Sequence, residues 1–143
     1  QWAEVTWRDP SLPRFVGDMP HGWVASGFIR AVRSLLAYER ESDSALVLAA
    51  GVPAAWVTRQ PGIGVRRMPT TYGVLNYSLR TDTDGALHLQ MSGDLTMPPG
   101  KIVLESPFEI PIRSVTVNGQ AVESFTAERT VINEFPADVV IHY

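Results

Sequence analysis

The sequence contains no cysteine among its 143 residues. This absence excludes a disulfide-stapled scaffold and any site that uses a thiolate as nucleophile or metal ligand. The absence of cysteine does not fix the cellular compartment. It is compatible with a chain that belongs to a secreted or periplasmic protein. The three histidines are scattered along the chain without metal-ligand spacing, so we expect neither a bound metal nor a cofactor.

The sequence also lacks a large excess of either sign of charge and long apolar runs. The formal net charge is −3 without a basic tract, so nucleic acid is not an expected partner. No stretch approaches the roughly 18 apolar residues of a membrane span, so a membrane is not an expected partner either. The first residues lack the regions of a signal peptide, as in a mature protein or an excised fragment. A hydrophobic content of 45% predicts a globular chain with a core.

An amphipathic helix is predicted from about Met19 to Glu41. Asp18 is a favourable N-cap residue, and Pro20 falls in the first turn, where its missing N–H group costs nothing. Apolar residues at helical spacing form a broad face that predicts cover on more than one side. The members of this face are Val24, Ala25, Phe28, Ile29, Val32, Leu35 and Leu36.

Most of the chain after Asp43 has the pattern of β-strands. Apolar and polar residues alternate over 75–80 and again over 87–92, on both sides of a glycine-bearing turn, which predicts an antiparallel hairpin. "SVTVNGQAV" (114–122) predicts a second, tight hairpin with Asn118-Gly119 in a type I′ turn. Further strands are expected at 45–51, 65–73, 101–106, 129–135 and 138–143, with one helical turn at Pro53–Val57. The predicted fold class is mainly β: an antiparallel β-sandwich of about eight strands preceded by one amphipathic α-helix.

Asp18 and His21 are the candidate catalytic residues, at the beginning of the predicted helix. Asp18 lies three residues before His21, close enough in sequence to orient the imidazole ring. The alternative is that His21 caps the helix or packs at a domain boundary. His88, which alternates outward on a predicted strand, and His142 are expected at the surface.

Other catalytic motifs are missing from the sequence. Glycoside hydrolysis needs two carboxylates that face each other across a sugar, and no convincing pair is present. The acids near residues 39–43 fall at the predicted helix end, and Asp82 and Asp84 are turn formers. There is no Gly-x-Ser-x-Gly elbow and no phosphate-binding glycine loop.

Trp23 and Trp56 are the candidate substrate-binding residues. A sugar-binding module exposes tryptophan as a stacking platform, whereas a core or a domain boundary buries it. Because Trp23 falls at a helix start and Trp56 in a loop, packing is the favoured interpretation of both.

The segments "GDMPHGWVASGFIRAVRSLLAYE", "LVLAAGVPAAWV", "VRRMPTTYGVLNYSLR", the "PPG" turn and "VTVNG" together resemble the C-terminal end of large bacterial multidomain proteins. Those proteins carry an (α/α)-toroid of the glycoside hydrolase type, often beside discoidin-like domains. The order is similar to that in α-L-rhamnosidases, and the resemblance covers nearly the whole chain from Trp7 onward.

The resemblance implies that residues 1–43 comprise an N-terminal strap and the last helix of a toroid-type catalytic domain. It implies that residues 44–143 are the accessory sandwich packed on that toroid, and that the catalytic carboxylates lie upstream of this chain. The expected function is therefore a non-catalytic C-terminal accessory β-sandwich of a carbohydrate-active enzyme. Its expected partner is the upstream catalytic domain, with a glycan as a further candidate. The alternatives are an independent carbohydrate-binding module and a structural or oligomerisation domain.

Overall fold

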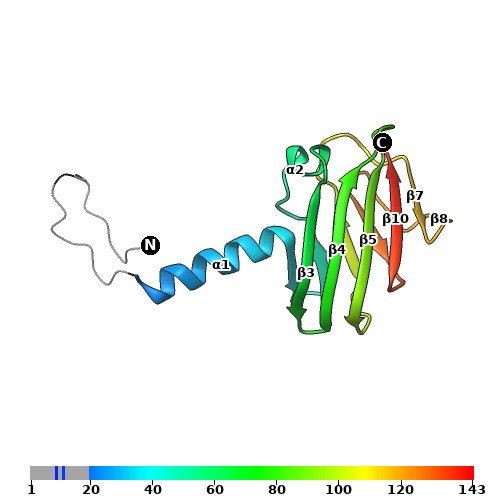
Figure 1. Cartoon of the computed structure of the whole chain (residues 1–143). Helices are drawn as coiled ribbons and strands as arrows, with labels where there is room; N and C mark the ends of the chain where they lie inside the picture. Colours follow the sequence, from blue (N-terminus) through cyan, green and yellow to red (C-terminus); the bar gives the residue numbers. More distant parts are fainter. Residues whose placement is uncertain (1–8, 10, 12–19) are drawn as a thin grey trace. The chain divides into compact units, whose positions relative to one another are not determined.

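The first helix or strand of the described residues is the helix α1 (Gly22–Leu36). The computed structural model describes residues 9, 11 and 20–143, and Figure 1 shows them in colour. Asp18 and nearly all of the expected strap lie outside the described residues. The chain divides into two compact units, residues 1–34 and 35–143, and each is described by itself.

The helix ends at Leu36, and the prediction that it continues to Glu41 is wrong. The next residues form strand β1 (Ala37–Arg40), which pairs antiparallel with β2 (Ala45–Leu48). Pairing with β2 gives the backbone groups of β1 hydrogen-bond partners, and this long-range arrangement overrides a weak local helical preference.

The last carbonyl groups of α1 are bonded to the sandwich. The carbonyl oxygen of Leu36 accepts hydrogen bonds from the N–H of Ala49 and the hydroxyl of Tyr77, both at 2.9 Å. The carbonyl of Leu35 accepts the N–H of Gly51 at 3.2 Å. Carbonyl groups that the end of a helix leaves without intrahelical partners are thereby hydrogen-bonded, which explains why α1 ends stably at Leu36.

The first sheet has four strands in the order β1-β2-β6-β9. Its pairs are antiparallel except β2 with β6, which is parallel. β2 comes from the apolar run predicted as a buried strand, and all four of its residues are buried. The remaining strands of this sheet are β6 (Ile102–Glu105) and β9 (Arg129–Ile132).

The second sheet has six strands in the order β3-β4-β5-β10-β7-β8, all antiparallel. Figure 1 shows β3, β4, β5 and β10 side by side. Both predicted hairpins are confirmed, and Asn118 and Gly119 have the positive φ angles of 51° and 79° that a type I′ turn requires. The strands are β3 (Ile63–Thr70), β4 (Gly73–Thr81), β5 (Leu87–Leu95), β7 (Ser114–Val117), β8 (Gln120–Val122) and β10 (Ala137–His142).

The core lies between the two sheets and is formed by the alternating residues that point inward from each. The first sheet contributes Leu46, Leu48, Ile102, Leu104 and Ile132, and the second contributes Leu75, Leu79, Leu87, Leu89, Val139 and Ile141. All of these side chains are fully buried. Alternation with polar residues on the opposite face gives the second sheet one buried and one solvated side.

The predicted fold class is confirmed: in the described part of the chain, ten strands form a two-layer β-sandwich after one long helix. The predicted helical turn at Pro53–Val57 is present as the short helix α2 (Ala54–Thr58). Its Val57 is buried in the core, so α2 is fixed to the sandwich by an apolar side chain.

Candidate functional site

His21 caps α1. Its ring Nδ1 accepts the backbone N–H of Val24 at 3.3 Å, and its carbonyl accepts the N–H of Ala25 at 3.1 Å. Both are bonds of an N-cap residue, whose side chain satisfies an N–H group that the first helical turn leaves unpaired. The imidazole also meets the indole of Trp23 edge-on, with ring centroids 6.2 Å apart. These contacts correspond to the structural alternative for His21, while Asp18 lies outside the described residues.

The two candidate tryptophans lie in different units of the chain. Trp23, in the first turn of α1, is 85% exposed. Trp56, on α2, is 46% exposed. Neither side chain is buried within the described residues, so packing of these tryptophans against a neighbouring domain stays a prediction.

Trp56 lines a pocket of about 370 Å³ at the edge of the second sheet. Arg59 and Gln60 line the same pocket, and Ile63 of β3 contributes an apolar side chain to its wall. An exposed aromatic ring, a guanidinium group and an amide therefore share one concavity. Sequence analysis did not single out Arg59 or Gln60, although the Trp-x-x-Arg-Gln order after a predicted helical turn places them near the indole.

The backbone under this pocket is held at several points. Gln60 donates from Nε2 to the carbonyl of Thr81 at 3.1 Å, and the Thr81 hydroxyl donates to the carbonyl of Val57 at 3.3 Å. The N–H of Gly62 donates to the carbonyl of Arg59 at 2.7 Å. Because Val57 is also buried, the residues that carry the pocket are anchored to β4 rather than suspended in a free loop.

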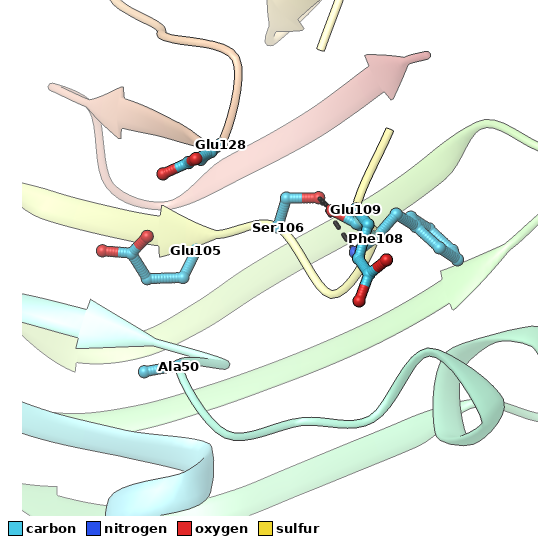
Figure 2. A pocket seen from close by; sticks show the side chains of 6 residues that line it. All are labelled: Ala50, Glu105, Ser106, Phe108, Glu109 and Glu128. Carbon is cyan, nitrogen blue, oxygen red and sulfur yellow. Dashed lines mark hydrogen bonds between the residues drawn. The ribbon is translucent and has the colours of Figure 1, made fainter. Parts of the chain in front are cut away.

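A second pocket, of about 440 Å³, is lined by three carboxylates: Glu105, Glu109 and Glu128. Figure 2 shows Glu105 and Glu128 on one side of Ser106 and Glu109 on the other. Glu105 lies 3.9 Å from the guanidinium of Arg129. Glu109 and Glu128 are exposed, whereas a carboxyl group that acts as a general acid at neutral pH is kept protonated by a desolvated site.

Ser106 does not have the surroundings of a nucleophile. Its hydroxyl donates to the carbonyl of Phe108, accepts the N–H of the same residue, and lies 3.0 Å from the hydroxyl of Tyr143. A nucleophilic serine needs a base within hydrogen-bond reach, and no imidazole or carboxylate is bonded to Ser106 in the described chain. Burial raises the pKa of Tyr143, and the hydrogen bond with Ser106 opposes this shift. The cluster therefore organises the turn after β6.

His88 occupies the expected outward position on β5 and contacts a residue of the adjacent β4–β5 turn. Its Nε2 lies 2.9 Å from Oδ2 of Asp82. The other carboxylate oxygen of Asp82 accepts the backbone N–H groups of Asp84 and Ala86 at 3.0 Å and 2.9 Å. The pair closes the β4–β5 turn, in agreement with the interpretation of Asp82 as a turn former.

The described residues contain no group of three or more His, Cys, Asp or Glu side chains arranged to hold a metal ion. Neither helix within the described ranges is long and apolar enough to cross a membrane.

The fold places the chain in the class of two-sheet β-sandwiches. Comparison with protein-family models, curated proteins and solved structures finds no match to the sequence or the fold.

Proposed function

We propose that the chain is the non-catalytic C-terminal accessory β-sandwich of a carbohydrate-active enzyme of the glycoside hydrolase type. In this proposal the chain packs against a helical catalytic toroid and supports it. The order of a helix followed by a β-sandwich, together with the segments that resemble the C-terminal region of such proteins, supports this assignment.

The observation that carries the proposal is the exposed apolar face of α1. None of the helix's residues is buried, although Ile29, Val32 and Leu35 are large, apolar and at helical spacing. Ile29 is 65% exposed. Burying one such side chain is worth about 1.5–3 kcal/mol, so a neighbouring helical surface that covered this face would gain substantial binding free energy. A toroid of helices supplies such a surface.

The sandwich suits a supporting role because its own core is complete. Apolar side chains from both sheets are fully buried between them, and the described chain leaves no buried side-chain polar atom without a hydrogen-bond partner. A domain with a closed core can brace a neighbour without depending on it for its own fold.

A turnover assay and a pair of substitutions test the proposal. The purified chain should hydrolyse no glycoside in a broad panel, and turnover that disappears with His21→Ala or Asp18→Asn would overturn the non-catalytic assignment. In the gene product that includes the upstream coding sequence, Ile29→Asp should lower the melting temperature and the glycosidase activity. Ser34→Asp, on the polar side of the same helix, is the matched control and should change neither. Equal effects of the two substitutions would contradict docking through the apolar face.

A further inference from the structure

We propose that the pocket beside Trp56 binds a hexuronic acid, either free or as a residue of an acidic glycan. Trp56 would stack on the sugar ring, Arg59 would pair with its carboxylate, and Gln60 would accept a hydrogen bond from a hydroxyl. The proposal goes beyond the accessory role and does not depend on α1.

The first argument is the way Trp56 is presented. Its indole is half-exposed at the rim of a concavity, while the next residue, Val57, is buried in the core and fixes α2. A half-exposed indole held on an anchored helix is a flat apolar surface that loses little conformational entropy when a ligand covers it. The C–H faces of a sugar ring are the apolar surfaces that match such a platform.

The second argument is charge. Among the described residues that line this pocket, Arg59 is the only one with a charged side chain. Within residues 20–143 it forms no ion pair and no side-chain hydrogen bond. A guanidinium group presents paired N–H donors that match the two oxygens of a carboxylate. The pocket therefore favours an anionic ring over a neutral or cationic one.

The third argument is the remaining polar capacity and the size of the pocket. The Nε2 atom of Gln60 is used by the carbonyl of Thr81, and its Oε1 atom accepts no hydrogen bond from the described residues. That oxygen is an acceptor for a sugar hydroxyl. The volume of about 370 Å³ lies at the small end of the range for ligand pockets, which suits one sugar ring rather than an oligosaccharide.

The test is an NMR titration that follows the indole N–H resonance of Trp56 in the isolated chain. D-glucuronate and D-galacturonate are the probes, with D-glucose and D-galactose as neutral counterparts at the same ionic strength. At least one uronate should give a saturable shift with a Kd on the order of millimolar, as expected for a small, open site. Its neutral counterpart should bind about tenfold more weakly because it lacks the charge-assisted pair with Arg59.

Three variants assign the residues. Trp56→Ala should abolish uronate binding, measured by the backbone resonances around Gly62, and Arg59→Gln should weaken it about tenfold. Trp23→Ala removes the other exposed tryptophan and should leave binding unchanged. Because Trp56 and Arg59 are not buried, both site variants should keep the wild-type circular dichroism spectrum and melt cooperatively.

Several results would overturn the proposal. One is the lack of any saturable shift with either uronate up to about 50 mM, far above the expected Kd. Others are equal affinity for the uronate and its neutral counterpart, and unchanged binding in Trp56→Ala. Equal binding of benzoate, which has a carboxylate and a flat ring but no hydroxyls, would contradict the sugar assignment. Because none of these results depends on docking of α1, their failure is distinguishable from failure of the proposed accessory role.

Discussion

The hydroxyl of Tyr77, on β4, donates a 2.9 Å hydrogen bond to the carbonyl of Leu36, the last residue of α1. Tyr77 is only 3% exposed and belongs to the core between the two sheets. The same carbonyl also accepts the N–H of Ala49, the residue that follows β2, so α1, β4 and the end of β2 are joined at this one oxygen. The point where the helix ends is therefore fixed by the sandwich core.

Removing the Tyr77 hydroxyl tests the energetic value of this contact. We expect Tyr77→Phe to lower the free energy of unfolding by about 1 kcal/mol, because the bond is buried but Leu36 keeps a second donor. Urea denaturation followed by circular dichroism measures the change. Tyr38→Phe is the control, since the Tyr38 hydroxyl makes no hydrogen bond with the described residues, and it should lie close to wild type. An equal loss in both variants would contradict the assigned role.

Burial also predicts a pH dependence at Tyr77. Desolvation raises the pKa of Tyr77 above its ordinary value of 10.0, so the folded state holds the neutral phenol. A group whose folded pKa is raised contributes stability below its unfolded pKa and loses that contribution as the pH rises above it. The free energy of unfolding should therefore fall above pH 10, with a smaller slope in Tyr77→Phe. Identical alkaline slopes for the two proteins would exclude Tyr77 as the cause.

Two glycines in the second sheet make a matched comparison. Gly93 has a φ of 130°, and a Cβ atom there would collide with the carbonyl oxygen of Val74 on the paired strand. Gly64, on β3, has open space where its Cβ would be. We expect Gly93→Ala to cost more than about 2 kcal/mol of unfolding free energy, and Gly64→Ala to stay within about 0.5 kcal/mol of wild type. Equilibrium denaturation of both variants checks this difference, and similar stabilities would contradict it.

The Asp82 carboxylate should support the β4–β5 turn only while it is ionised. The hydrogen bond with His88 is the main cause that lowers the pKa of Asp82 below its ordinary value of 3.8, helped by the N–H groups of Ala86 and Asp84. A lowered folded pKa contributes stability above the unfolded value and loses it as the pH falls through the folded value.

Asp82→Ala should therefore lower the melting temperature at neutral pH, and its deficit against wild type should shrink below pH 3.8. Asp84→Ala is the control, since its side chain makes no hydrogen bond with the described residues. Differential scanning calorimetry at neutral and acidic pH makes the measurement. A deficit that stays constant across this range would show that the carboxylate charge is irrelevant.

The two hairpins were predictable from the sequence because the patterns that define them are local. Alternation of Leu75, Tyr77 and Leu79 with polar residues identifies a half-buried strand, and Asn118-Gly119 identifies its own turn type. The end of α1 was not predictable in the same way. β1 is defined by its pairing with β2 and the helix end by contacts from residues distant in sequence, and neither relationship leaves a periodic pattern.

The candidate site was predictable only in part. Trp56 stood out by its residue type, but its exposure and the concavity that it shares with Arg59 and Gln60 depend on how the following turn folds back along β4. The sequence also drew attention to His21, where the structure places a helix cap. A histidine beside a helix start has the same local pattern whether it caps the helix or takes part in catalysis.

Hydrogen–deuterium exchange at the backbone amides of α1 tests the proposed accessory role most directly. The measurement compares the isolated chain with a longer protein in which the proposed catalytic domain precedes it, using the amides of Leu75 and Leu89 in the core as an internal reference. The account predicts that amides from Phe28 to Val32 exchange rapidly in the isolated chain, whose helix buries no residue, and slowly in the longer protein. Rapid exchange of α1 in both proteins, with the core protected in both, would contradict the claim that this face docks on a catalytic domain.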